Sequence, residues 1–274
     1  MNKQKFAFGK NGQYFLDNYF NEERLESAVN SLKEILNIES LSGKKFIDIG
    51  CGSGLFSLAA YKLNAEKIIS LDVDKFSIRC CNQLFETYNK PPNWQIIEGS
   101  ILDDEFVETL EKCDVVYSWG VLHHTGNMWK AIDNAANLTS DNGVLVIAIY
   151  NKVVNFCIFS DGRFGNSRLW EIEKKFYNKM PDFIKSILNG FIAGFLLFLY
   201  LFTFQNPIKK IKMFPKKFRG MSWYVDIKDW IGGYPYEYAD VEEIFKFLKK
   251  KNFMLQNLKF KNNLGNNEYV FKKI

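Results

Sequence analysis

Phe46-Ile47-Asp48-Ile49-Gly50-Cys51-Gly52-Ser53-Gly54 is the stretch that decides the fold of this chain. Its first four residues have the apolar pattern of a short buried strand. The glycines then allow the backbone a sharp turn and a close approach to a ligand. Residues 55–63 are mostly apolar and contain neither Gly nor Pro, which predicts a helix. A strand, a glycine turn and a helix in this order predict a nucleotide-type ligand at the helix N-terminus.

Two kinds of cofactor compete for this turn, and two residues separate them. A dinucleotide turn reads G-x-G-x-x-G and would need glycine at position 55, where this chain has Leu55. Asp48 would repel a pyrophosphate, whereas it would attract the positive groups of S-adenosylmethionine. The pattern Asp48-x-Gly50-x-Gly52-x-Gly54 resembles the first motif of the class I methyltransferases. That resemblance implies S-adenosylmethionine as cofactor and S-adenosylhomocysteine as product.

Strands and helices alternate along the following hundred residues. Apolar strands are predicted at 68–71, 94–97, 114–118 and 143–150, with a helix at 131–138 that ends in a turn at 140–143. This alternation predicts an α/β fold with a mostly parallel, doubly wound sheet, whose ligands lie outside the carboxyl ends of the strands. The resemblance implies seven strands, helices on both faces and a mainly helical insertion before the last strands.

The chain is accordingly divided into three regions. Residues 1–42 form an N-terminal helical segment that covers the cofactor, and residues 43–151 with 238–274 form the Rossmann-like domain. Residues 152–237 form a helical cap that shapes the acceptor site.

The residues predicted to bind the cofactor follow the strand ends. Asp72 ends the second strand, about 20 residues past the turn, where a carboxylate can accept both ribose hydroxyls. Asp74 competes for this role or for the cap of the next helix, and we favour Asp72 for the ribose because it directly ends the strand. Ser100 stands where many family members carry Asp against the adenine. With the resemblance, the predicted set is Tyr14, Phe15, Asp48, Gly50, Cys51, Gly52, Gly54, Leu55, Phe56, Asp72, Val73, Asp74, Ser100, Ile101, Trp119, Gly120 and Val121.

Two longer segments resemble one bacterial branch of the class I methyltransferases. They are Ser118-Trp119-Gly120-Val121-Leu122-His123-His124-Thr125-Gly126 and Asp229-Trp230-Ile231-Gly232-Gly233-Tyr234-Pro235-Tyr236-Glu237. The likeness covers nearly the whole chain except about 185–217. Members of this branch resemble enzymes of surface-polysaccharide and small-metabolite pathways. The resemblance therefore implies O-methylation of a sugar or phosphate-type group in a bacterial capsule or lipopolysaccharide pathway.

Both histidines of the chain follow the fourth strand, and histidine is the natural base near neutral pH. His124, or His123 beside it, is therefore a candidate base, although packing against the next helix explains the pair equally well. Tyr150 and Arg219 complete the candidate catalytic set. Charge combined with aromatic surface suits a saccharide or phosphate acceptor, with the packing of a lid as the alternative. The predicted acceptor-binding residues are Asn151, Arg168, Trp223, Tyr234, Tyr236 and Glu237, with Asp226, Asp229 and Trp230 beside them.

The composition of the 274 residues argues against several classes of protein. A 47% share of hydrophobic residues argues against a disordered chain. The net charge of +5 is mild and most lysines are scattered, so no nucleic-acid partner is expected. The one local concentration of basic residues, at 209–219, suits phosphate, an acidic glycan or anionic lipid. Five cysteines without a C-x-x-C spacing predict neither disulfides nor a metal site, and they fit a reducing cytoplasm. Residues 1–10 lack the apolar core of a secretory signal.

Residues 186–208 carry no charge, and the run at 187–204 approaches the length of a membrane span. A span would separate 219–237 from the cofactor, so three interpretations remain: a cap helix, a homodimer interface, or a peripheral anchor on the inner face of the membrane. The run also motivates a lipid-linked or quinone-like acceptor as the alternative substrate. A non-catalytic cofactor-binding module is a further alternative, against which the intact Asp48, Gly50, Gly52 and Asp72 argue.

Overall fold

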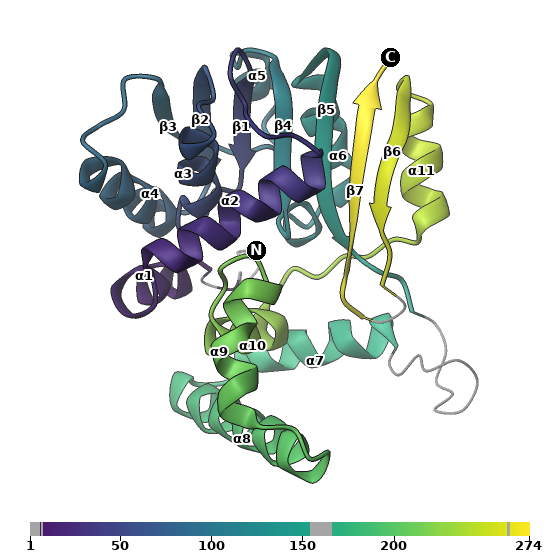
Figure 1. The fold of residues 1–274 in the computed structure, drawn as a ribbon. Coiled ribbons are helices and arrows are strands. Elements are labelled where there is room, and N and C mark those ends of the chain that lie inside the picture. The colour runs from purple at the N-terminus through teal and green to yellow at the C-terminus, as the bar shows by residue number, and fades with distance from the viewer. Residues whose placement is uncertain (1–5, 7, 154–165, 262–263) are drawn as a thin grey trace.

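One sheet of seven strands, in the order β3-β2-β1-β4-β5-β7-β6, organises the computed structural model of this chain (Figure 1). The first five strands run parallel, while β7 pairs antiparallel with both β5 and β6. The structure describes residues 6, 8–153, 166–261 and 264–274. This arrangement confirms the predicted α/β fold with a mostly parallel, doubly wound sheet.

The described helices and strands follow the predicted alternation closely. They are α1 Phe8–Asn18, α2 Glu22–Leu36, β1 Lys45–Ile49, α3 Leu55–Lys62, β2 Lys67–Asp72, α4 Lys75–Thr87, β3 Trp94–Glu98, α5 Asp104–Glu108, β4 Cys113–Trp119, the 3-10 turn η1 Leu122–His124, α6 Met128–Asn137, β5 Thr139–Tyr150, α7 Ser167–Lys179, α8 Asp182–Phe202, α9 Pro207–Lys217, α10 Trp223–Gly232, α11 Val241–Lys249, β6 Phe253–Lys259 and β7 Asn266–Lys273.

Each face of the sheet has its own apolar core because successive strand residues point to opposite faces. On one face, Phe46 and Tyr117 pack with side chains from α1, α2, α3 and α4. On the other face, Ile47 and Leu145 pack with side chains from α6 and α11. The sheet is thus covered on both sides, which leaves the strand ends as the place for a ligand.

The predicted turn at 140–143 lies inside β5, which begins at Thr139 rather than at Gly143. Cys113 pairs with Thr139, but Val115 pairs with Val144, so β5 carries extra residues between these two pairs. Asn142 has a φ of 61°, as a turn residue would. The sequence indicated the turn, but not that the chain belongs to the sheet on both sides of it, because pairing with β4 is a tertiary contact.

Helices α7, α8, α9 and α10 lie beyond the carboxyl ends of the parallel strands, at the bottom of Figure 1. They share a third apolar cluster, which includes Tyr177, Ala193, Trp223 and Ile227. Helix α10 lies between this cluster and the sheet, since its Val225 belongs to the core of the main domain. The cap therefore reaches the strand ends through α10.

Candidate active site

The glycine turn between β1 and α3 combines backbone conformations that favour glycine with open space. Gly50, Gly52 and Gly54 have φ values of 73°, 55° and 80°. A Cβ atom on Gly50 would lie 2.3 Å from Val121, and one on Gly54 would lie 2.8 Å from Cys81. Apart from its chain neighbours, no atom of the described residues lies within 4 Å of a Cβ placed on Gly52. The turn at Gly52 therefore has both the conformation and the space that a bound ligand requires.

Asp72, at the end of β2, faces this turn. One of its carboxylate oxygens accepts a hydrogen bond from Gly52 N at 3.0 Å, and the other accepts from Asp74 N at 2.9 Å. Burial raises the pKa of Asp72. Asp74 has a different role, because it caps α4 by accepting from Phe76 N at 2.8 Å and holds the start of α1 by accepting from Gly9 N at 3.1 Å. The geometry thus gives the two aspartates different roles: Asp72 faces the glycine turn, and Asp74 caps a helix.

Asp48 ends a buried chain of hydrogen bonds that runs through three strands and α3. Trp94 Nε1 donates to Ser70 at 2.7 Å, Ser70 donates to Ser57 at 2.6 Å, and Ser57 donates to Asp48 at 2.7 Å. Asp48 is 3% exposed, and burial raises its pKa to about 7 against the opposing effect of the Ser57 hydroxyl. The sequence pointed to Asp48 but gave no signal for its three supporting residues, which approach it only through strand pairing.

Arg219 reaches the end of β4 from the segment after α9. Its guanidinium lies 3.6 Å from the centre of the Trp119 ring and 4.2 Å from that of Phe56, and it donates to the hydroxyl of Tyr117. The indole Nε1 of Trp119 is buried without a hydrogen-bond partner among the described residues. The Arg219 cation and the unpaired Trp119 Nε1 donor therefore lie close together at the end of β4. Both Trp119 and Phe56, which contact Arg219, are predicted cofactor residues.

Helix α1 passes over the glycine turn. A Cβ on Gly12 would lie 3.7 Å from Ser53 N, which places the helix directly against the turn. Phe15 is buried in the core that includes Cys51 and Leu55. Tyr14 is 38% exposed, with the Lys228 ammonium 4.8 Å from its ring. Helix α1 therefore combines a packing role at Phe15 with a surface position at Tyr14.

Three further predicted cofactor residues lie at the ends of β2 and β3, while Gly120 directly follows β4 with a φ of 75°. Val73 is 59% exposed directly after Asp72. The Ser100 hydroxyl accepts from Leu102 N at 3.2 Å, and Ile101 is buried. The loop after β3 is thus ordered by Ser100 itself, next to the exposed end of β2.

His123 and His124 form the turn η1 after β4. Nδ1 of His124 donates to the carbonyl oxygen of Pro235 at 2.5 Å, since a carbonyl can only accept. Burial lowers the pKa of His124 to about 3 and that of His123 well below its ordinary value. His123 is fully buried, with its ring 4.1 Å from that of Tyr150. Both imidazoles are therefore neutral at pH 7, and His123 serves packing.

Helix α10 places two carboxyl groups near the end of β5. Asp226 and Asp229 both act electrostatically on Tyr150, the last residue of that strand. Asn11 of α1 donates to Asp229 at 2.7 Å. Burial raises the pKa of Asp226 to about 6 and that of Asp229 to about 7, with the charge of Asp226 adding to the second shift. Such groups exchange a proton near neutral pH, which suits a general base.

Helix α7 holds the C-terminal end of α10 in place. Lys174 is fully buried, and its Nζ donates to the carbonyl oxygen of Trp230. Asn178, one turn later, donates to Gly232 O at 2.7 Å. Burial lowers the pKa of Lys174 to about 7. Nothing in the sequence separates Lys174 from Lys175 beside it, so this contact between helices was missed.

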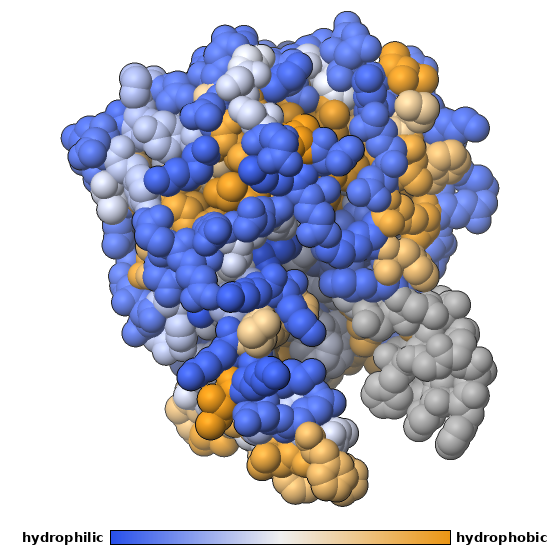
Figure 2. Space-filling view, viewed as in Figure 1, coloured by the Kyte–Doolittle hydropathy of each residue, from blue (hydrophilic) through white to orange (hydrophobic). Residues whose placement is uncertain are grey.

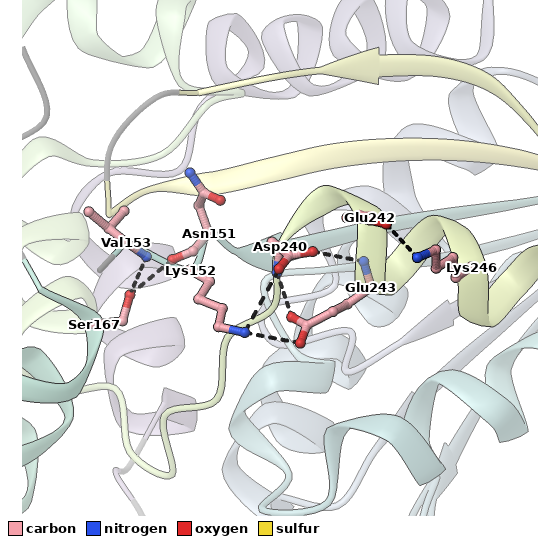
Figure 3. A network of polar contacts seen from close by, with 8 residues as sticks. All are labelled: Asn151, Lys152, Val153, Ser167, Asp240, Glu242, Glu243 and Lys246. Carbon is pink, nitrogen blue, oxygen red and sulfur yellow. Dashed lines mark hydrogen bonds and ion pairs between the residues drawn. The ribbon is translucent and has the colours of Figure 1, made fainter. Parts of the chain in front are cut away.

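A network around the end of β5 fastens α7 and α11 to the sheet (Figure 3). Lys152 pairs with Glu243 at 3.0 Å and with Asp240 at 3.8 Å, at the start of α11. Ser167, the first residue of α7, accepts from Val153 N at 2.8 Å and donates to the Asn151 carbonyl at 3.2 Å. The network fixes the helices that border the site.

The predicted acceptor residues are spread over several environments. Tyr236 is buried with its ring 4.8 Å from Tyr150, beside the histidines. Glu237 accepts from Met128 N at 3.1 Å and so caps α6 from a distance. The remaining four are Asn151, which donates to Lys261 O at 3.0 Å, Tyr234, whose carbonyl accepts from Phe6 N at 3.0 Å, Trp223 in the cap cluster, and Arg168 on the surface of α7. Of this set, Tyr236 contacts the ring of Tyr150 at the end of β5, and Glu237 stabilises a helix.

The part of the chain that the structure describes holds no group of three or more His, Cys, Asp or Glu side chains that could bind a metal ion.

Comparisons with known proteins show which families this chain resembles. The family described as "Methyltransferase domain" matches residues 40–189. A ribosomal protein L11 methyltransferase of Macrococcus caseolyticus is 35% identical over 104 residues, which are 38% of this chain and 31% of that protein. A ubiquinone biosynthesis O-methyltransferase of Pelagibacter ubique is 24% identical over 148 residues, covering 54% of this chain and 55% of that protein. The matched segments thus span about a third and about half of these relatives.

The fold also matches solved structures. An O-methyltransferase family protein from Burkholderia thailandensis superposes with a TM-score of 0.52 at 10% sequence identity. The match covers 91% of this chain and 58% of that one. At this identity the likeness concerns the fold of the two chains.

Proposed function

Because this chain belongs to the methyltransferase domain family, we propose that it transfers a methyl group from S-adenosylmethionine to a hydroxyl oxygen of a small polar acceptor. Membership in the family confirms the predicted enzyme class and its cofactor. For the acceptor we propose a sugar or phosphate-type group of a bacterial surface-glycan pathway. The O-methyltransferase from Pelagibacter ubique supports oxygen as the methylated atom.

The residues present fit the cofactor at the glycine turn. Gly52 leaves open space beside a backbone in the left-handed region, and Asp72 lies against the same turn. Trp119 Nε1 offers a buried donor without a partner among the described residues. S-adenosylmethionine supplies an activated methyl group, so the protein mainly has to align the acceptor and handle its proton.

The observation that carries the oxygen assignment is Asp229. A hydroxyl acceptor keeps a proton that a base must remove, and the pKa of Asp229 is raised to about 7. Asn11 fixes one carboxylate oxygen by donating to it, and α7 holds the end of α10. His124, with a pKa of about 3, is a much weaker base. We therefore assign proton removal to Asp229 rather than to His124.

The test is a transfer assay with tritiated S-adenosylmethionine against separate fractions of small polar metabolites, glycans, lipids, protein and ribosomal RNA. We expect label in a polar hydroxyl compound, identified as a methyl ether by mass spectrometry and NMR. Asp229→Asn should lower kcat by about 100-fold or more, within the range of general base catalysis. Wild-type activity should rise with pH through about 7, because Asp229 must be ionised to accept a proton.

Two controls keep this test specific. Calorimetric titration with S-adenosylhomocysteine should give Kd values within about twofold for wild type and Asp229→Asn, since the carboxyl is not assigned to the cofactor. His124→Asn should retain most of kcat. Label in protein, RNA or an N-methylated amine would overturn the assignment of a hydroxyl acceptor, and a large kcat loss confined to His124→Asn would overturn the role of Asp229.

A lipid-linked or quinone-like acceptor is the second candidate. The exposed apolar face of α8 favours it, since α8 packs against α10 on the side of the cap away from the sheet. In the same assay, this candidate requires the label to extract into organic solvent.

A further inference from the structure

One face of helix α8 is lined with large apolar side chains that nothing in the described structure covers. They recur every three or four residues, which places them in a single stripe along the helix. Each is between 51% and 71% exposed, although large apolar side chains are normally buried. The stripe consists of Phe183, Ile187, Phe191, Phe195, Phe198 and Phe202.

The opposite face of α8 holds the helix to the cap. Asn189 and Ala193 are buried there, and the Tyr177 hydroxyl donates to Asn189 at 3.0 Å. Ile192 and Leu196 pack into the same cluster as Trp223 of α10. The stripe therefore cannot turn inward without breaking these contacts, and it stays directed away from the protein.

Helix α8 lies on the protein rather than apart from it. Among the described helices it is the one long and apolar enough to cross a membrane, and 11% of its apolar window is buried. Both neighbouring helices return to the protein, however, since α7 contacts α10 while α9 contacts α2 and α10. A helix that crossed a membrane would place α7 and α9 on opposite sides. The geometry instead fits a helix that lies in the plane of a surface.

Positive charge is concentrated beside the stripe. Residues 182–218 contain six lysines and one aspartate, a surplus of five that equals the net charge of the whole chain. Lys209, Lys210, Lys212 and Lys217 are exposed on α9. Phe204, in the turn between the two helices, is 101% exposed and Ile208 is 66% exposed. Figure 2 shows this end of the molecule as apolar surface bordered by hydrophilic residues.

We propose that α8 and α9 together form a docking surface for an anionic lipid bilayer. The phenylalanine stripe and Phe204 enter the boundary between headgroups and acyl chains, while the lysines of α9 meet the lipid phosphates. Docking places α10, and with it Asp229, one helix layer from the lipid surface. The inference does not depend on which acceptor the enzyme methylates.

Charge also decides between a membrane and a second copy of this chain. In a symmetric dimer through α8, the same surface patch of both copies would meet. The exposed lysines of both copies, Lys209, Lys210, Lys212 and Lys217, would then come together, which is unfavourable, whereas an anionic surface attracts both.

Vesicle sedimentation of the full chain tests the proposal. We expect binding to vesicles of phosphatidylcholine mixed with phosphatidylglycerol, weaker binding to phosphatidylcholine alone, and loss of binding at high salt. Phe191→Ser with Phe198→Ser should abolish detectable binding. Phe260→Ser is the matched control, because Phe260 is 53% exposed but lies outside α8 and α9.

The lysines require a second pair of variants. Replacing Lys209 and Lys210 by Gln should weaken binding roughly 30-fold, since each lysine near an anionic surface contributes about a fivefold factor. The matched control replaces Lys249 and Lys250, a lysine pair at the end of α11, and should change binding less than about twofold. Circular dichroism and thermal melting of every variant verify that it is folded.

Three results would overturn the inference. The first is a folded wild type that does not bind anionic vesicles. The second is equal binding by wild type and by the variant of Phe191 and Phe198. The third is a wild-type dimer in light scattering that this variant dissociates while no vesicle binding is seen, which would make the stripe an interface between copies.

Discussion

Gly52 is the residue at which backbone conformation and ligand space meet. Its φ of 55° costs an L-amino acid about 1–2 kcal/mol, and a Cβ there would meet no described residue within 4 Å other than its chain neighbours. Gly43 offers a close comparison, because it has a φ of 69° and equally open surroundings but lies before β1, outside the turn. Both glycines therefore need the left-handed backbone conformation, but only Gly52 lies in the turn between β1 and α3.

Gly52→Ala and Gly43→Ala should separate stability from cofactor binding. Both should lower the free energy of unfolding by about 1–2 kcal/mol, measured by urea denaturation, because both place a Cβ in the left-handed region. Gly52→Ala should also weaken S-adenosylhomocysteine binding tenfold or more in calorimetric titration, while Gly43→Ala should leave the Kd unchanged. Equal affinities for the two variants would contradict the placement of the cofactor beside Gly52.

At the scale of single elements, several contacts reach a helix from a distant part of the sequence. Helix α6 begins at Met128, whose N–H donates to Glu237, more than a hundred residues later. The N-cap residue of α6, Asn127, makes no side-chain cap of its own. Glu237 therefore supplies an acceptor that the local sequence lacks, and its negative charge also favours the positive end of the helix.

Glu237→Ala should lower the free energy of unfolding by about 1 kcal/mol, as loss of a helix cap does. Glu237→Gln keeps the acceptor oxygen and should lower it less. Thermal melting and urea denaturation measure both effects. A rise in KM for the acceptor with unchanged stability would instead support the sequence-based prediction that Glu237 binds the acceptor.

At the scale of the whole molecule, burial shifts the pKa values of carboxyl groups both in the sheet and in the cap helices. Burial raises the pKa of Asp48, Asp229 and Glu173 to about 7. A carboxyl whose folded pKa is raised contributes stability that is complete below its unfolded pKa and is lost as the pH rises through the folded value. The lowered pKa of His124 has the opposite effect. Its contribution to the free energy of unfolding grows as the pH rises from about 3 to the ordinary pKa of histidine.

Asp48→Asn isolates one of these contributions, because Asn cannot ionise and keeps an oxygen for the Ser57 hydroxyl. Wild type should lose stability relative to this variant between pH 5 and pH 8, by about 3 kcal/mol at most for a fully buried group. Urea denaturation at several pH values measures the difference. If the free energy of unfolding changes with pH in the same way for both proteins, Asp48 does not titrate in this range.

The order of strands and helices could be predicted because each element has its pattern in contiguous residues. The strand Lys45–Ile49, the turn glycines and the helix from Leu55 are neighbours in sequence, and so are Asp72 and its strand. The turn at 140–143 was predicted from local residues as well, but its place inside β5 was not. That place depends on pairing with β4, which no local pattern encodes.

The residues of the candidate site also fall into those that local sequence predicts and those that only tertiary contacts reveal. Asp48 and Asp72 could be named from the sequence because their positions are fixed relative to strand ends. The prominence of Asp229 over His124 could not be predicted, since it comes from pKa shifts that burial and neighbouring charges produce. The Lys174 contact and the hydrogen-bond chain from Trp94 to Asp48 were missed because both join segments that are distant in the sequence.

By itself, the sequence determined the family, the glycine turn and the alternating fold, because these rest on backbone preferences and on periods of two and 3.6 residues. The tertiary structure alone decided which side chains meet at the strand ends, how far their pKa values shift, and which face of α8 remains outside the protein. Those properties depend on distance and burial between segments that lie as far apart in the sequence as Asn11 and Asp229, and only the folded chain sets them.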